Sequence, residues 1–212
     1  MSNRPQSPLL SVQQSQLVVI DVQERLLPVI RNHLSVAASI RFLLDAAAIL
    51  QVPSIVTEQY PKGLGATVEL LRNHPATITT LEKLKFSAAE TLLTELSVSD
   101  EAALEHPRLP AKQIVLAGIE SHVCVQQTAL QLFEKGFQVF VAADCVGSRN
   151  ADDHQWALNR MASAGVIITT AEAIAFEWCE RAGNDSFKAL SRLVRDRDSQ
   201  RSDSTSAASR VR

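Results

Sequence analysis

Three side chains of this sequence together carry the chemistry of acyl transfer: the carboxylate of Asp21, the ammonium of Lys83 and the thiol of Cys124. A thiol becomes a strong nucleophile once it has lost its proton. A neighbouring carboxylate can accept that proton and later return it to a leaving group, and a nearby ammonium favours the thiolate. The three groups would therefore support hydrolysis through a covalent thioester.

Each of these residues falls at the end of an expected strand. Asp21 closes the apolar run 16–21, Lys83 follows the run 77–81, and Cys124 lies in the first turn of the helix expected after the strand 113–118. Ligands of an open parallel α/β sheet bind at the carboxyl ends of its strands. We therefore expect the three side chains to meet in one crevice.

The start of a helix also bears on the reactivity of Cys124, because unpaired N–H groups there favour negative charge. We expect a thiolate at neutral pH, which iodoacetamide should alkylate much faster than it alkylates Cys145 or Cys179. The substitution Asp21→Asn should slow this reaction. Backbone N–H groups between Gly118 and Cys124 could bind the oxyanion.

Each residue also has a purely structural interpretation. A single cysteine in an α/β domain is commonly a small buried apolar residue, and Cys124 could be one. Asp21 could bridge a strand end, and Lys83 could be a solvated surface lysine. His122 lies close to Cys124 and could take part in the chemistry or could be a polar residue at the start of the helix.

The elements that must position these residues alternate along the whole chain. The apolar periodicity predicts strands at 16–21, 54–57, 77–81, 113–118, 137–142 and 166–169, and helices at 35–50, 66–73, 87–96, 121–135, 152–164, 170–181 and 185–194. Such alternation indicates βαβ units, and hence a doubly wound α/β domain whose six-stranded parallel sheet has helices on both faces.

The two ends of the chain differ from this pattern. Residues 1–15 are polar and are expected to form a flexible N-terminal arm before a hydrolase domain at 16–194. Residues 195–212 are rich in serine, aspartate and arginine and contain almost no apolar residue, so we expect a disordered polar tail.

The composition excludes several classes of protein. The 212 residues carry a net charge of −2 with no basic run in the domain, which argues against a nucleic-acid partner. No apolar stretch reaches the roughly 18 residues that a membrane span needs, and we identify no secretory signal. The three cysteines include no C-x-x-C pair, so we expect a reducing cytoplasm and neither a zinc site nor disulfides. No G-x-G-x-x-G follows the first strand, which argues against a nucleotide cofactor.

Three segments follow one another in the chain: Val-Val-Ile-Asp-Val-Gln at 18–23, Leu-Glu-Lys-Leu-Lys-Phe-Ser-Ala at 81–88, and Gly-Ile-Glu-Ser-His-Val-Cys-Val at 118–125. In this order they resemble the isochorismatase-like cysteine hydrolase superfamily. Within it, the third segment and the loop Thr-Glu-Gln-Tyr-Pro at 57–61 are most similar to the isochorismatase domain-containing proteins. Each alone is weak, but the three in sequence are specific.

This resemblance implies a sheet ordered 3-2-1-4-5-6 and a catalytic triad of Asp21, Lys83 and Cys124. Lys83 is preferred over Lys85 because the catalytic lysine of the family is the first of its block. The resemblance also implies a cis peptide bond before Glu120, and an oxyanion hole formed by the backbone N–H groups of Glu120 and Cys124. Relatives commonly assemble, so a homo-oligomer is implied as well.

Two departures from related enzymes narrow the chemistry. Nicotinamidases of the superfamily bind a metal through histidines after the second strand, whereas residues 58–65 contain no histidine, so we expect no metal and no cofactor. Isochorismatases that cleave a vinyl ether lack the cysteine, so Cys124 favours hydrolysis of a C–N or acyl bond. Gln23, Tyr60 and Phe86 are candidates for substrate binding.

The sequence thus predicts a metal-independent cysteine hydrolase that acts on a small amide-like substrate through a thioester. Two alternatives remain open: a non-catalytic binding or scaffold protein that retains the fold, and an isochorismatase-type vinyl-ether hydrolase.

Overall fold

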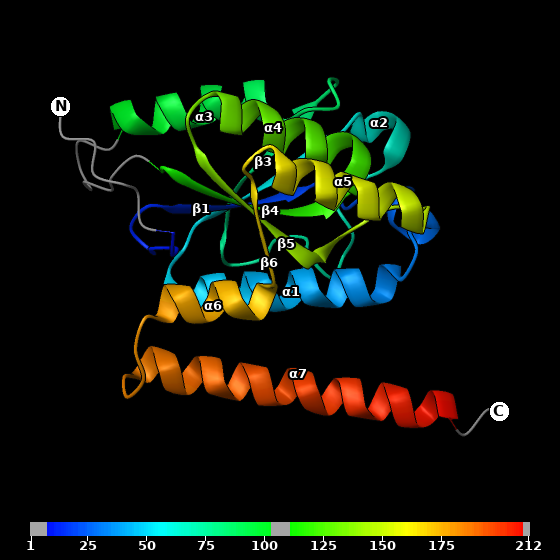
Figure 1. The fold of residues 1–212 in the computed structure, drawn as a ribbon, viewed down its shortest axis with the longest axis vertical. Coiled ribbons are helices and arrows are strands. Elements are labelled where there is room, and N and C mark those ends of the chain that lie inside the picture. Colours follow the sequence, from blue (N-terminus) through cyan, green and yellow to red (C-terminus); the bar gives the residue numbers. More distant parts are fainter. Residues whose placement is uncertain (1–7, 103–110, 210–212) are drawn as a thin grey trace.

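Six parallel strands form a single sheet in the order β3-β2-β1-β4-β5-β6 (Figure 1), as the sequence and the family resemblance predicted. The computed structural model describes residues 8–102 and 111–209, and the side chains of 8–96 and 111–199. The strands are β1 (Ser15–Ile20), β2 (Ser54–Gln59), β3 (Thr77–Lys83), β4 (Gln113–Ile119), β5 (Gln138–Gly147) and β6 (Ile167–Thr169).

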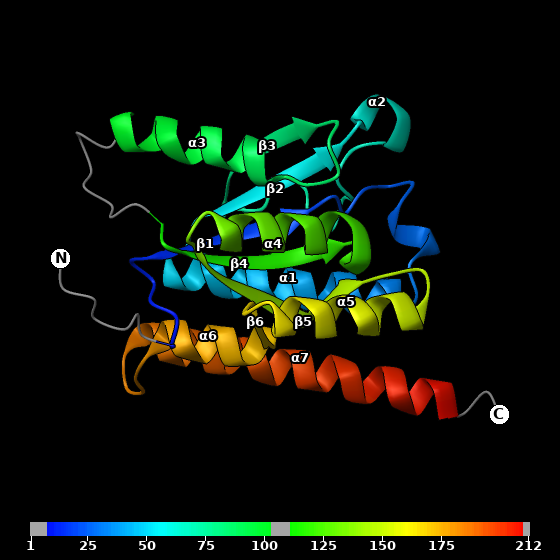
Figure 2. The same cartoon turned by 45° about the horizontal axis from the view of Figure 1, so that its top comes forward.

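Helices cover both faces of this sheet. They are α1 (His33–Leu50), α2 (Pro61–Leu64), α3 (Ala89–Ala102), α4 (Gln126–Glu134), α5 (Ala151–Ser163), α6 (Ala171–Cys179) and α7 (Asp185–Ser209), with a short 3₁₀ turn η1 (Leu27–Val29) and a π-helical turn η2 (Ser121–Val125). Figures 1 and 2 show α3, α4 and α5 on one side of the sheet, and α1, α6 and α7 on the other.

The alternation of side chains along each strand explains why both faces are covered. In β1, Leu17 and Val19 belong to the core under α1 and α6, whereas Val18 and Ile20 belong to the core under α3, α4 and α5. All six residues of β1 are buried. A strand that is apolar on both faces must lie inside a sheet that carries helices on both sides.

Helix α1 corrects one expectation about membranes. Over its 18 residues its mean hydropathy is 1.5, enough in length and composition to cross a bilayer. Half of this window is buried within the protein, where the helix packs on the sheet and on α6. The apolar character of α1 is therefore accounted for by its place in the core.

Most element boundaries match the prediction, but the region after β2 does not. The short helix expected at 66–73 is absent; turns occupy that stretch, and the helix α2 lies earlier, where a loop was expected. Pro61 explains the shift, because proline suits the first turn of a helix and its ring fixes a helical φ.

Both ends of the expected domain need correction. The backbone N–H of Leu10 donates to Glu177 and that of Ser11 donates to Gln113, so residues 8–14 are docked against the domain, while 1–7 lie outside the described residues. The expected polar tail continues α7 as far as Ser209. Its apolar content is low, but Arg197 fixes it to the domain.

Candidate active site

Asp21 follows β1 directly and lies at the centre of the carboxyl edge of the sheet. The backbone turns sharply at Asp21, with a φ of +53°, and the residue is fully buried. One carboxylate oxygen accepts a hydrogen bond of 2.7 Å from Thr57 Oγ1, at the end of the neighbouring strand β2. The other oxygen lies 2.6 Å from Lys83 Nζ.

Lys83 is the last residue of β3, and its ammonium is held by four acceptors. Besides Asp21, it donates to Gln59 Oε1 at 2.8 Å and to the carbonyl oxygens of Lys85 at 3.2 Å and Phe86 at 2.8 Å. Its side chain is only 1% exposed. A buried ammonium needs such partners, because an isolated buried charge is strongly unfavourable. The ion pair between Lys83 and Asp21 thus brings together residues 62 positions apart in the chain.

Cys124 lies in the π-helical turn η2, between β4 and α4, and is 7% exposed. Its sulfur lies close enough to Asp21 for the charge and hydrogen bonding of that carboxylate to raise the pKa of the thiol. Thr128, one turn further along α4, donates to the Cys124 carbonyl at 2.6 Å and accepts from the N–H of Ala88 at 2.9 Å. The structure therefore brings all three candidate residues together.

The ionisation of Cys124 differs from the expectation of a thiolate. Burial, the largest cause, raises the pKa of the thiol to about 12, and the charge of Asp21 and the hydrogen bond to it act in the same direction. Lys83 and a backbone hydrogen bond from Glu120 lower the pKa, but by less. Without substrate, Cys124 is therefore a protonated thiol near the carboxylate of Asp21.

The backbone before Cys124 contains the cis peptide bond that the family resemblance implied, between Ile119 and Glu120. Gly118 precedes it with a φ of +119°, and a Cβ at this position would lie 2.1 Å from the carbonyl oxygen of Ile20. Only glycine lets β4 approach β1 this closely. The hydrogen bond from Glu120 toward the sulfur is consistent with one of the two expected oxyanion donors, and the role of the Cys124 N–H stays a prediction.

The three residues proposed for substrate binding lie in different environments. Gln23 is fully buried; it accepts from the N–H of Gln59 and donates to the carbonyls of Gln59 and Gly65. This corrects its expected role, because its amide fixes the loop after β2 and is not open to a substrate. Tyr60 and Phe86 are 51% and 57% exposed and remain candidates for the rim.

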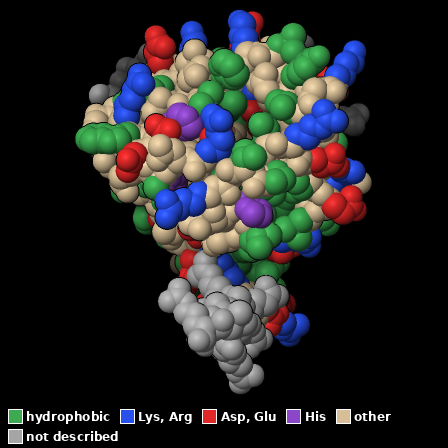
Figure 3. All heavy atoms as spheres, turned by 90° about the vertical axis from the view of Figure 1, so that its right-hand side faces the viewer, with side chains coloured by type: hydrophobic (Ala, Val, Ile, Leu, Met, Phe, Trp, Pro, Cys, Tyr) green, Lys and Arg blue, Asp and Glu red, His purple; other side chains and the backbone are tan. Residues whose placement is uncertain are grey.

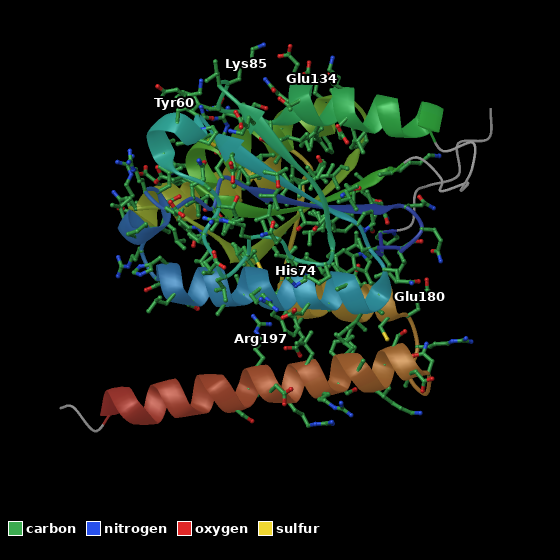
Figure 4. The ribbon with its side chains drawn as sticks, turned by 180° about the vertical axis from the view of Figure 1, so that it is seen from behind. Tyr60, His74, Lys85, Glu134, Glu180 and Arg197 are labelled. Carbon is green, nitrogen blue, oxygen red and sulfur yellow. The ribbon has the colours of Figure 1, made fainter. Side chains whose placement is uncertain are left out.

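Figure 3 shows the surface at this edge of the sheet, and Figure 4 shows the side chains from behind. In Figure 3 acidic and basic side chains are interspersed over it, and neither sign of charge dominates. In Figure 4, Tyr60 and Lys85 lie on the same side of the molecule, away from α7. Within the described residues, no group of three or more histidine, cysteine or acidic side chains is placed to hold a metal ion.

The sequence prediction missed three residues that support the site. Thr57 and Gln59 hold the oxygen of Asp21 and the ammonium of Lys83, and Thr128 joins the Cys124 turn to the loop after β3. Thr57 and Gln59 could have been suspected, because polar residues at the end of an apolar parallel strand face the ligand edge of a sheet. No local signal in the sequence identifies Thr128.

Comparison with known proteins agrees with this geometry. The family model described as the isochorismatase domain matches residues 15–173, which contain all three candidate residues. The chain belongs to the isochorismatase family.

Individual members of the isochorismatase family are similar over most of this chain. Isochorismatase domain-containing protein 1 of Salmo salar is 38% identical over 82% of the chain, and the match spans only 59% of that relative's own length. The structure of the MAR1 ribonuclease of Caenorhabditis elegans is 36% identical, with a TM-score of 0.78 over 88% of this chain and 92% of that one. The ycaC gene product of Escherichia coli, described as an octameric hydrolase of unknown specificity, is 24% identical with a TM-score of 0.78, over 94% and 98% of the two chains, and shows the fold alone.

Proposed function

We propose that this isochorismatase-family chain is a cysteine hydrolase that cleaves a C–N or acyl bond of a small molecule through a thioester. The observation that supports this most strongly is the contact of the Cys124 thiol with a buried carboxylate, Asp21, that Lys83 and Thr57 hold in place. A nucleophile, a base and an orienting cation are the parts that covalent acyl transfer requires.

In the proposed first step, the sulfur of Cys124 attacks the carbonyl carbon while the thiol proton passes to Asp21. The raised pKa of the thiol suits this order, because the proton leaves only as the new S–C bond forms. The backbone N–H groups of Glu120 and Cys124 are proposed to bind the oxyanion. Asp21 then protonates the leaving amine, and the C–N bond breaks.

In the second step, Asp21 accepts a proton from water, which attacks the carbonyl carbon of the thioester. The C–S bond then breaks, Asp21 returns the proton to the Cys124 sulfur, and the acid product leaves. Lys83 keeps Asp21 oriented in both steps. Its positive charge also offsets the negative charge of the Asp21 carboxylate whenever that group is deprotonated. These steps use only groups of the chain itself. Both this proposal and vinyl-ether cleavage are hydrolytic reactions. Only the proposed thioester mechanism gives Cys124 a covalent role.

A small substrate fits the site better than a polymer, because the sulfur-bearing residue is only 7% exposed and the net charge of the chain is −2. RNA binding relies on positive surface that attracts phosphates. The ribonuclease similarity is therefore assigned to the shared fold, and an RNA substrate is one arm of the test. Because the three cysteines are free, we also propose a reducing, cytoplasmic location, which would keep Cys124 unoxidised.

The test measures release of ammonia and carboxylate from a panel of small amides and ureides, with isochorismate and single-stranded RNA as separate arms. We expect at least one amide or ureide to be hydrolysed by the wild type and not by Cys124→Ala. Pyruvate release from isochorismate that survives Cys124→Ala would instead support the vinyl-ether hydrolase, and inactivity in every arm would support a binding or scaffold protein.

A further inference from the structure

The turn that carries Cys124 is bonded residue by residue to the connection between β5 and α5. We call residues 148–154, which form this connection and the start of α5, the clamp segment. The contacts are Glu120 Oε2 with the Arg149 N and Nε at 3.2 Å each, Ser121 Oγ with His154 Nδ1 at 2.9 Å, and His122 Nδ1 with Ser148 Oγ at 3.0 Å. Three consecutive residues are thus each held from the same side.

The contact between His122 and Ser148 is largely enclosed. Ser148 is 2% exposed, and the side chain of His122 is 25% exposed. The other ring nitrogen of His122 lies 3.9 Å from a carboxylate oxygen of Asp153. Both edges of the imidazole therefore face the clamp segment, which fixes the orientation of the ring.

The local backbone explains why such a clamp is needed. In η2 the N–H of Val125 donates to the carbonyl of Glu120 at 3.2 Å, an i to i−5 bond that makes this turn wider than an α-helical one. Single π-helical turns are rare and occur frequently at functional sites. His122 stands midway between Glu120, whose backbone donates toward the sulfur, and Cys124 itself.

We propose that His122 is a positioning residue: through Ser148 it holds the turn so that the Glu120 N–H and the Cys124 sulfur face the same substrate carbonyl. This inference rests on the proposed function of Cys124 as a nucleophile. It gives His122 no contact with the reacting atoms. Its effect is on acyl transfer, which needs both groups aligned, because displacement of a reacting group by about 1 Å can reduce a rate about 100-fold.

Two reagents separate this role from general reactivity of the thiol. With p-nitrophenyl acetate, the sulfur of Cys124 attacks the ester carbonyl, an S–C bond forms, the C–O bond breaks, p-nitrophenolate leaves and the thiol proton passes to Asp21. This reaction passes through an oxyanion. With iodoacetamide, the sulfur attacks the CH₂ carbon and iodide leaves, so no oxyanion forms. The rate of this alkylation therefore reports only the accessibility and the ionisation of the sulfur.

Two substitutions of His122 form a matched pair. The side-chain amide of asparagine reaches the position of the histidine Nδ1, whereas that of glutamine reaches the position of Nε2. His122→Asn should therefore keep the bond to Ser148 and acylate at near the wild-type rate. His122→Gln and Ser148→Ala should each slow acylation by about tenfold or more, while alkylation by iodoacetamide stays within about twofold.

The outcomes distinguish the failure of this inference from the failure of the proposed function. If Cys124→Ala removes acylation but His122→Asn and His122→Gln behave alike, or if alkylation falls in parallel with acylation, the positioning role is wrong and the nucleophile stands. If acylation persists in Cys124→Ala, the proposed function itself is overturned. Thermal melting of each variant verifies that it is folded.

Discussion

At the scale of single residues, the arrangement around Asp21 decides how Cys124 can react. Sequence reasoning placed a thiolate next to a cation, but burial and the neighbouring carboxylate raise the pKa of the thiol to about 12. The structure therefore points to a thiol that loses its proton during attack. Two predictions at this scale follow from the signs of the charges.

The substitution Asp21→Asn should speed alkylation of Cys124 by iodoacetamide at pH 8, contrary to the slowing expected from the sequence. It removes a negative charge and a hydrogen bond that both raise the pKa of the thiol, while Lys83, which lowers it, remains. Each unit of decrease gives about tenfold more thiolate, partly offset by its lower nucleophilicity, for a net gain of about threefold.

Peptide mass spectrometry of Cys124 over time measures this rate. In the wild type the rate should keep rising with pH up to about 11 without a plateau, since the thiol titrates near 12. A wild-type plateau near neutral pH, or slower alkylation in Asp21→Asn, would show that the cysteine is a stabilised thiolate. Acyl transfer should be lost in this variant in either case, because it lacks the base.

Lys83→Met should lower the free energy of unfolding by about 3–5 kcal/mol, because it leaves the buried carboxylate of Asp21 without its counter-ion. Lys85→Met is the matched control. Its side chain is 75% exposed and pairs with Glu90 at the surface, so its loss should change the stability by less than about 1 kcal/mol. Urea denaturation compares the two variants, and equal losses would contradict the assignment of Lys83.

The parts of the site that depend on local sequence patterns could be predicted, whereas contacts between segments distant in the chain could not. Asp21, Lys83 and Cys124 were identifiable because each lies at or shortly after the end of a strand whose apolar pattern is local, and because the motifs around them resemble one family. The hydrogen-bond partners of Gln23 could not be predicted. A side-chain amide at the carboxyl edge of a sheet can bind a substrate or the backbone of a loop equally well. Only the fold of residues 59–65 around it decides between them.

At the scale of elements, the close approach of β4 to β1 places the nucleophile turn beside Asp21. Gly118→Ala should destabilise the fold by at least about 2 kcal/mol more than Gly136→Ala. Both glycines have positive φ, +119° and +89°, but a Cβ at 118 meets the Ile20 carbonyl at 2.1 Å, and one at 136 meets no atom within 4 Å. The difference between the two variants in thermal or urea unfolding isolates this contact, and equal effects would refute it.

The elements themselves were largely predictable, because buried parallel strands and amphipathic helices carry distinct periodicities. The π-helical start of the helix at 121–125 was not, since its apolar pattern over five residues matches an α-helix equally well. The extension of β5 to Gly147 was also missed. It depends on pairing with β4 beyond a register shift, which is a property of the neighbouring strand.

At the scale of the whole molecule, α7 shows how a polar segment becomes part of the domain. The Arg197 side chain is 9% exposed and reaches from α7 toward α1 (Figure 4). It donates to Ser39 Oγ at 3.0 Å and to Asp144 Oδ2 at 2.8 Å, and it lies 4.2 Å above the ring of Phe42. A composition rule cannot foresee one arginine with three partners more than 50 residues away.

Arg197→Ala should release the C-terminal half of α7 while leaving the core intact. We expect faster hydrogen exchange in the described part of α7 after Val194, with a loss of about 1–3 kcal/mol of local protection. Arg195→Ala, at an exposed position on the same helix, should exchange as the wild type does. Unchanged exchange in Arg197→Ala would show that other contacts dock the helix.

The surface of the described residues also supports assembly of identical subunits. Large apolar side chains that are exposed include Leu34 at 76%, Ile78 at 62%, Leu70 at 48% and Leu84 at 77%. Exposed apolar side chains favour association where several of them meet at one interface. We therefore predict a homo-oligomer, which light scattering would report as a multiple of the 23.2 kDa chain, whereas a mass of one chain at micromolar concentration would refute it.

The central claim, that Cys124 forms a covalent acyl intermediate, is tested most directly by mass spectrometry of the protein quenched in acid after mixing with p-nitrophenyl acetate. The account predicts an acetyl group on the peptide that contains Cys124 in the wild type and none on the corresponding peptide of Cys124→Ala, with Cys145 and Cys179 unmodified. Acetylation confined to other residues, or a Cys124 peptide that stays unmodified while p-nitrophenolate is released equally by both proteins, would contradict it.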